Sequence, residues 1–199
     1  MQLLHKVGRN PIIAAVRRPE ELADALSSPV DNVFFMGGTV TELVQSVRLT
    51  KEAGKGAFVH LDLIKGLSST DRESLEWIAK YAEADGVISP KSHIIKEAKR
   101  FGLYGILHLF IIDTAALENG LRLCRQIDPD GIELMPGVVD KVIRTFSESL
   151  NDKLIIASGL IQTCEEVNAA LDAGATSLSV SNKELWNITF DQLNESNLL

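Results

Sequence analysis

Two pairs of small polar residues near the end of the chain have the composition of an anion-binding site. Ser158-Gly159 follows the apolar run 154–157, and Ser181-Asn182 follows the run 177–180. If the two runs are neighbouring parallel strands, their ends bring hydroxyls, backbone N–H groups and the start of a short helix to one place. Helix N-termini attract anions because unpaired N–H groups and the helix dipole both point there. The two pairs therefore predict a phosphate site.

Polar and charged side chains also end or follow the other apolar runs, at positions 17, 60, 62, 65 and 133. Hydroxyl, amide, imidazole, carboxylate and cationic groups gathered at one face suit a small phosphorylated polyol. Each residue also has a simpler interpretation, as a turn, a solvated surface cation or a hydrogen-bonded core residue. The residues expected to bind the ligand are Arg17, His60, Asp62, Lys65, Glu133, Ser158, Gly159, Ser181 and Asn182.

The elements that must position these residues alternate strictly along the chain. Short apolar runs, typical of buried parallel strands, are followed each time by a helical stretch. Eight such units predict a single (β/α)8 barrel of the TIM type with minimal loops, spanning residues 1–186, and 187–199 form a polar C-terminal tail. In this fold the loops after strands seven and eight commonly bind phosphate. The expected strands are residues 11–16, 32–36, 57–62, 86–89, 103–111, 131–134, 154–157 and 177–180.

The composition of the chain limits the classes of protein to which it can belong. The 199 residues are 45% hydrophobic and 24% charged, as in an ordinary globular domain, and no apolar run approaches the ~20 residues of a membrane span. Cys124 and Cys164 fall in expected helices and fit reduced thiols, so we expect a cytoplasmic protein without membrane contact. A net charge of −7 does not favour nucleic-acid binding, although a local basic patch remains compatible with it.

Enzyme chemistry and metal binding have weaker support. A Schiff-base aldolase needs a lysine inside the barrel, and no expected strand carries one in its middle. His108 fits a hydrogen-bonded core histidine, and Glu133 fits a carboxylate held by a neighbouring cation. Imidazole and carboxylate groups do bind divalent ions, but no tight ligand spacing supports a metal site, so we expect none. The four residues that make such a site conceivable are His60, Asp62, His108 and Glu133.

Several motifs, taken together and in this order, resemble one known family. They are Val59-His60-Leu61-Asp62-Leu63-Ile64-Lys65-Gly66, Gly86-Val87-Ile88-Ser89, Phe110-Ile111-Ile112-Asp113-Thr114, Ile132-Glu133-Leu134-Met135-Pro136-Gly137-Val138 and Ser181-Asn182-Lys183-Glu184-Leu185-Trp186. The chain resembles the glycerol 3-phosphate-responsive antiterminators from about residue 12 to 186. The matched family positions include Arg17, His60, Asp62, Glu133 with Pro136-Gly137, and Gly159. Two positions depart from the family pattern, which usually has an arginine at His108 and a second glycine at Ser158.

The resemblance implies a transcription regulator rather than an enzyme. Such a protein responds to glycerol 3-phosphate, needs no cofactor, and acts on leader mRNA to prevent premature termination in operons for glycerol uptake and catabolism. The best local basic edge for RNA lies in the helix after the fourth strand, and the simpler interpretation of that edge is a solvated helix face. A homodimer would double the basic area, although the sequence does not fix one. The residues expected to contact RNA are Lys91, Lys96, Lys99 and Arg100.

Two other classes of function stay open on the sequence. Carboxylates at the strand ends, such as Asp62, Asp113 and Glu133, would also serve acid–base chemistry. The rival interpretation is therefore a phosphate-binding barrel isomerase or lyase acting on a small sugar phosphate. The third interpretation is a plain scaffold protein, which no phosphate ester should stabilise.

Overall fold

The computed structural model describes residues 10–196 and confirms the expected fold class. Eight parallel strands follow one another around a closed barrel, and β8 pairs with β1 to complete the ring. The boundaries differ from the predicted ones by two residues at most, as is usual for short buried strands. The strands are β1 (Ile12–Val16), β2 (Asn32–Phe35), β3 (Gly56–His60), β4 (Gly86–Ser89), β5 (Tyr104–Phe110), β6 (Gly131–Met135), β7 (Leu154–Ser158) and β8 (Ser177–Val180).

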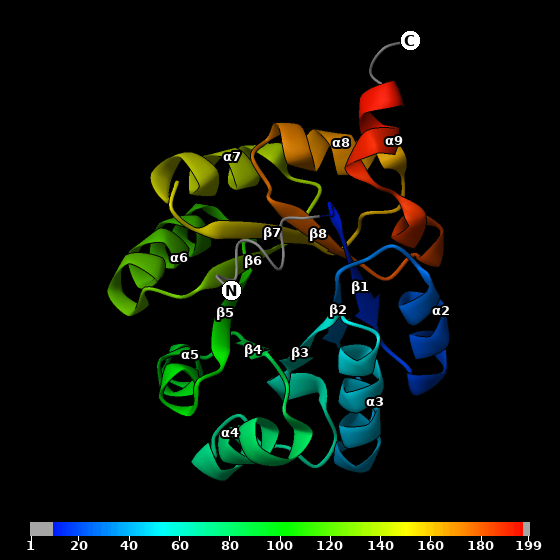
Figure 1. Ribbon diagram of the computed structural model, residues 1–199. Coiled ribbons are helices and arrows are strands. Elements are labelled where there is room, and N and C mark those ends of the chain that lie inside the picture. The colour runs from blue at the N-terminus through cyan, green and yellow to red at the C-terminus, as the bar shows by residue number, and fades with distance from the viewer. Residues whose placement is uncertain (1–9, 197–199) are drawn as a thin grey trace.

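The helices form an outer ring around the strands, as Figure 1 shows. Several begin at side-chain caps that the sequence provides: Thr39, Asp113 and Thr163 each accept a hydrogen bond from a first-turn N–H group. The helices are η1 (Pro19–Glu21), α2 (Leu22–Ser27), α3 (Val40–Glu52), η2 (Leu61–Leu63), α4 (Arg72–Trp77), η3 (Ile78–Ala82), α5 (Ser92–Ala98), η4 (Lys99–Phe101), α6 (Thr114–Ile127), α7 (Asp140–Ser149), α8 (Cys164–Asp172), η5 (Lys183–Asn187) and α9 (Phe190–Ser196).

The barrel interior is apolar in one layer and polar in the next. The apolar layer is a separate buried cluster that includes Phe34 and Phe58, whose ring centroids lie 5.5 Å apart. Because side chains alternate along a strand, the residue two positions after Phe58 also faces inward, and it is His60. His108 follows Ile106 in the same way on β5. The polar layer therefore lies nearer the C-terminal ends of these strands, where barrels of this type place their binding sites.

The third strand is shorter than the sequence predicts. We expected it to run from 57 to 62, and this C-terminal boundary is wrong. The strand ends at His60, and the next three residues form the 3-10 turn η2. Asp62 therefore leaves the barrel wall, and its contacts lie outside the interior layer, as described below.

The segment after β8 packs back onto the barrel. Trp186 in η5 is 1% exposed, and its indole Nε1 donates a hydrogen bond to the Val180 carbonyl. Ile188 and Leu193 are also buried, so the described part of the segment 187–199 carries apolar contacts as well as polar residues. Among the residues that the structure describes, no helix has both the length and the apolar character required to cross a membrane.

Candidate functional site

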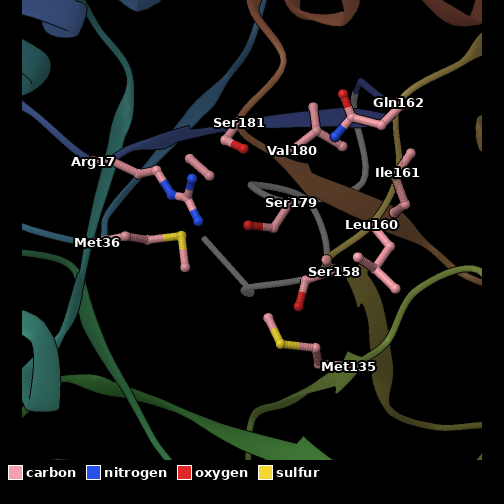
Figure 2. A pocket seen from close by; sticks show the side chains of 12 residues that line it. Arg17, Met36, Met135, Ser158, Leu160, Ile161, Gln162, Ser179, Val180 and Ser181 are labelled. Atoms are coloured by element: carbon pink, nitrogen blue, oxygen red, sulfur yellow. The ribbon is translucent and has the colours of Figure 1, made fainter.

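A small pocket opens where β1, β7 and β8 end. Its volume is about 60 Å³, far below the ~300–1,000 Å³ of sites for drug-sized ligands, so it fits a compact head group. Four of the residues predicted from the sequence line it: Arg17, Ser158, Gly159 and Ser181. Figure 2 shows the Arg17 guanidinium and the Ser179 hydroxyl pointing toward each other, with Ser158 beside them. The other lining residues are Ala15, Met36, Met135, Leu160, Ile161, Gln162, Ser179 and Val180.

Serine hydroxyls from β7 and β8 line the barrel interior beneath this opening. Ser158 lies opposite Ser179 in the register of the two strands, and Ser177 lies one inward-facing position below. All three hydroxyls are buried, and none has a hydrogen-bond partner among the described residues. Buried polar groups are nearly always satisfied, so three partnerless hydroxyls on adjacent strands indicate a place where a polar ligand or water binds.

Arg17 supplies the positive charge of the pocket. It follows β1, its side chain is exposed, and it forms no ion pair with any residue in the described part of the chain. Its backbone is held by Glu21, whose carboxylate accepts hydrogen bonds from the N–H groups of Arg17 (2.9 Å) and Arg18 (3.3 Å). Burial raises the pKa of Glu21, but these bonds and the Arg18 side chain outweigh it and hold the pKa below its usual value. The ionised Glu21 therefore fixes the loop that presents Arg17.

Gly159 is required by two features of the pocket wall. Its φ of 77° lies in the left-handed region, which favours glycine. A Cβ at this position would come within 2.9 Å of Cγ of Met135, so the Met135 side chain would have to move. The Gly159 carbonyl also accepts a hydrogen bond from the N–H of Gly137, at 3.1 Å. The backbone at the end of β7 is therefore held in a fixed conformation beside the pocket.

His60, His108 and Glu133 form a second polar group, deeper in the barrel. His108 Nδ1 lies 2.5 Å from Oε2 of Glu133, and His60 Nε2 lies 3.2 Å from the same oxygen. Glu133 is fully buried and each histidine is 5% exposed. Burial raises the pKa of Glu133, but the two imidazoles beside it lower it further, so the pKa lies well below its usual range and the carboxylate is ionised. The prediction that His108 is a hydrogen-bonded core histidine is confirmed.

Asp62 belongs to a different group, at the edge of the barrel. Its carboxylate accepts hydrogen bonds from the hydroxyls of Ser69 and, at 2.7 Å, Ser89. Lys91 Nζ lies 3.3 Å from its Oδ1 and also donates to the Ser69 hydroxyl. Both oxygens of Asp62 are thus used to hold the chain between β3 and α4 against the end of β4.

The two remaining predicted ligand residues lie outside the pocket lining. Lys65 is exposed, and its backbone forms an isolated bridge to Thr39. Asn182 uses its side chain within the protein, because it accepts a hydrogen bond from the N–H of Glu184 (3.1 Å) and donates one to the Gln162 carbonyl (3.1 Å). Asn182 therefore caps η5 as expected and orients the loop beside Ser181.

The four predicted RNA-contacting residues are mostly paired with acidic groups. Lys91 is bound to Asp62, as described above. Lys99 Nζ lies 3.6 Å from Asp130, and Arg100 lies 2.9 Å from Glu97. Lys96 is exposed and, within residues 10–193, has no acidic partner. The basic edge of α5 therefore carries much less uncompensated charge than the sequence suggests.

Some residues of the pocket were missed in the sequence. Ser179 and Gln162 line it, and Ser177 lies below it, but none was among the expected ligand residues. A signal for the serines was available, because Ser177 and Ser179 alternate along β8 and so share its inner side, and Ser181 follows the strand at the same spacing. Gln162 has no comparable pattern, since its place depends on how the loop after β7 folds over the mouth.

Comparison with known proteins places these features in a family. The family model of the glycerol-3-phosphate responsive antiterminators matches residues 12–186, which is the whole barrel and all but the last residue of η5. The chain belongs to this family. The resemblance seen in the motifs of the sequence is thereby confirmed.

Relatives of this antiterminator family member share nearly its full length. Protein YgcP of Escherichia coli (strain K12), described as uncharacterized, is 35% identical over 188 residues, which cover 94% of this chain and 97% of that protein. The glycerol uptake operon antiterminator regulatory protein from Listeria monocytogenes str. 4b F2365 has 31% identity and a TM-score of 0.82, covering 88% of this chain and 94% of that one. A glycerol uptake operon antiterminator-related protein from Thermotoga maritima MSB8 has 29% identity and a TM-score of 0.79, covering 90% and 99%.

Proposed function

We propose that this protein is a cytoplasmic transcription antiterminator that binds glycerol 3-phosphate at the barrel mouth and then acts on a leader mRNA. The ligand half rests on the buried hydroxyls of Ser158 and Ser179 and on the Arg17 guanidinium, which have no partners within the described residues. A phosphate dianion would accept hydrogen bonds from Ser158, Ser179 and Ser181 and would neutralise Arg17. Charge-assisted bonds of this kind are about twice as strong as neutral ones.

The glycerol part would extend from the phosphate toward the interior. The polar layer there contains His60 and Glu133, whose Oε1 atom has no hydrogen-bond partner among the described residues. A carboxylate oxygen accepts from a hydroxyl, and an imidazole nitrogen can accept or donate. These two residues therefore suit the hydroxyls of a short polyol, while Lys65 at the rim would add charge without direct contact.

Direct binding is tested by thermal unfolding of the full chain with glycerol 3-phosphate, glycerol or inorganic phosphate. We expect glycerol 3-phosphate to raise the Tm most, because only it uses both the phosphate pocket and the polar layer. Ser181→Asp, an exposed change at the pocket, should abolish the shift through charge repulsion. Ser149→Asp, on the exposed end of α7, is the matched control and should keep it. An equal shift in both variants would remove the pocket from the proposal.

The RNA half of the proposal is supported by family membership, and α5 remains the surface we propose for it. Phosphate contacts make RNA affinity fall steeply with salt. We expect binding of a glycerol-operon leader transcript only with glycerol 3-phosphate present, with lower affinity in Lys96→Glu. Glu52→Lys adds positive charge on the exposed end of α3 and should leave affinity unchanged. Binding that ignores both the ligand and Lys96→Glu would contradict this choice of surface.

One observation argues against an aldolase that forms a Schiff base with its substrate. No lysine among residues 10–193 is fully buried, so none stands desolvated inside the barrel as a Schiff-base nucleophile requires. An isomerase or lyase that uses carboxylates is tested directly. Prolonged incubation with glycerol 3-phosphate and with small sugar phosphates, followed by NMR, should return each compound unchanged. Turnover that Asp62→Asn abolishes would favour the enzyme.

A further inference from the structure

The buried group of His60, His108 and Glu133 has features that hydrogen bonding inside the protein leaves unexplained. The two imidazoles and the carboxylate come from β3, β5 and β6, and one ligand atom of each lies within 4.8 Å of the others. The closest contact among them, between His108 Nδ1 and Glu133 Oε2, uses only one oxygen of the carboxylate. Glu133 Oε1 is buried and has no hydrogen-bond partner in the described chain, and the buried His60 Nε2 has only its 3.2 Å contact with Oε2.

The unsatisfied Oε1 atom and the fully buried carboxylate, which both imidazoles meet on the one oxygen Oε2, suit a positively charged partner that the three groups share. A buried charge is tolerated in proteins when it is paired or when it coordinates a metal. One cation placed among the three groups would contact both imidazoles and the carboxylate together.

We propose that His60, His108 and Glu133 bind a first-row divalent transition-metal ion of the Zn²⁺ class. Two imidazole nitrogens and one carboxylate oxygen are a common ligand set for such ions, whereas Ca²⁺ and Mg²⁺ prefer oxygen ligands throughout. Zn²⁺ held at about 2.0–2.2 Å needs ligand atoms farther apart than the 2.5 Å between His108 and Glu133, so this contact opens on binding. The 3.2 Å between His60 and Glu133 already fits.

The surroundings hold the imidazoles in place and leave one side of the ion open. His108 lies edge-on to Phe110 at 4.4 Å and His60 lies edge-on to Phe34 at 6.1 Å, which fixes both ring planes. Glu133 has no exposed surface, while each histidine keeps 5%. The histidines are therefore the side from which an ion enters. Three protein ligands leave a fourth position on that side for water or a ligand hydroxyl.

This site has almost no signature in the sequence because its ligands are distant along the chain. His60 and His108 are 48 residues apart (108 − 60), and Glu133 follows 25 residues later (133 − 108). Only closure of the barrel brings these three side chains together in its interior. The sequence-based metal candidate also contained Asp62, which the structure places at the barrel edge.

The test uses Co²⁺ as a spectroscopic probe, without glycerol 3-phosphate, so it is independent of the proposed function. Full-length protein carrying Cys164→Ser, which removes the exposed thiol, is stripped with a chelator and titrated with Co²⁺. We expect visible d–d absorption that saturates at one ion per chain and disappears when Zn²⁺ is added. Zn²⁺ alone should raise the Tm.

Three variants decide the outcome. His108→Ala and the milder His60→Gln should each weaken Co²⁺ affinity by at least about ten-fold. His93→Ala, which removes an exposed histidine on α5, should change nothing. If His108→Ala fails to fold by circular dichroism, His60→Gln alone decides. Absence of d–d absorption in the parent protein, or equal affinity in His60→Gln, overturns the proposal.

Discussion

Ser158 and Ser179 face each other across the β7–β8 register, with 1% and 3% of their surfaces exposed and no hydrogen-bond partner in the described chain for either hydroxyl. Leaving two such groups unsatisfied costs folding free energy that no internal contact repays. This arrangement fits a site whose hydrogen bonds are completed by a ligand. Mutations of these two serines should therefore affect ligand binding and protein stability differently.

Replacing Ser179 by alanine should weaken glycerol 3-phosphate binding without destabilising the ligand-free protein. Removing an unsatisfied hydroxyl leaves the free energy of unfolding unchanged within about 0.5 kcal/mol, or raises it slightly. The lost bond to a charged phosphate contributes about 1.5–3 kcal/mol, so the Kd should rise by about ten-fold or more. Calorimetric titration and urea unfolding measure the two quantities.

The control for this variant is Ser177→Ala. Ser177 is also buried and without a partner among the described residues, lies two residues earlier on the same strand, and does not line the pocket. It should show the same stability with unchanged affinity. If Ser179→Ala destabilises the ligand-free protein by more than about 1 kcal/mol, its hydroxyl has an internal partner and the argument for a ligand weakens.

Most of the fold was predictable from the sequence, because each strand is an apolar run and several helices have their own start signal. The third strand shows where this fails. Leu61-Asp62-Leu63 continues an alternating pattern, yet Asp62 is drawn away by Ser69, Ser89 and Lys91, which the sequence places 7, 27 and 29 residues later. Contacts of that range depend on the closed barrel. The same is true of His60, His108 and Glu133, whereas Ser158 and Gly159 were predictable because they end a strand.

The carboxylate of Glu21 should stabilise the protein in a pH-dependent way. Its folded pKa lies below the usual 4.5, so its contribution is complete above about pH 4.5 and is lost as the pH falls through the folded value. Most of the effect comes from the N–H groups of Arg17 and Arg18, since the Arg18 side chain is 66% exposed and its ion pair is screened. Glu21→Gln should cost about 1–2 kcal/mol at pH 7.

Urea unfolding from pH 7 to pH 3 tests this assignment. The difference between wild type and Glu21→Gln should shrink as the pH falls below about 4.5, because the protonated wild type then resembles the amide. Glu20→Gln, at an exposed position next to it, should differ little from wild type at every pH. If the difference in the free energy of unfolding stayed constant from pH 7 to pH 3, Glu21 would act through its shape rather than its charge.

Two glycines with nearly equal backbone angles separate conformational strain from crowding. Gly54 has a φ of 76°, and a Cβ added there would meet no atom within 4 Å, whereas Gly159 has a φ of 77° and would place a Cβ 2.9 Å from Met135. Gly54→Ala should cost about 1–2 kcal/mol from left-handed backbone alone. Gly159→Ala should cost about 1–3 kcal/mol more through overpacking, and it should also weaken ligand binding. Urea unfolding measures the loss of stability in each variant. Equal losses would show that Met135 moves aside without a measurable cost.

The two cysteines should differ sharply in reactivity. Burial raises the pKa of the Cys124 thiol to about 12, so it stays protonated and shielded at neutral and mildly alkaline pH. Cys164 is exposed at the start of α8. A thiol reagent at pH 8 should therefore label one cysteine per folded chain, and none in Cys164→Ser. Rapid labelling of Cys124 in the folded protein would place it in a segment that opens locally.

Asp62 should act as a positioning residue for the chain between β3 and α4. It accepts hydrogen bonds from Ser69 and Ser89 and lies 3.3 Å from Lys91, which ties that chain to the start of α5. Asp62→Asn removes the charge and one accepting oxygen, and should cost about 1–2 kcal/mol. Hydrogen exchange should then accelerate in residues 61–71.

The control and the functional consequence of Asp62→Asn separate a positioning role from direct ligand binding. Asp71→Asn, in the same segment but bonded through its side chain to Thr70, should leave hydrogen exchange unchanged. Because Lys91 begins the proposed RNA-binding helix, Asp62→Asn should reduce the effect of glycerol 3-phosphate on leader binding more than it reduces glycerol 3-phosphate affinity. The reverse order would make Asp62 a direct ligand residue, as the sequence first predicts.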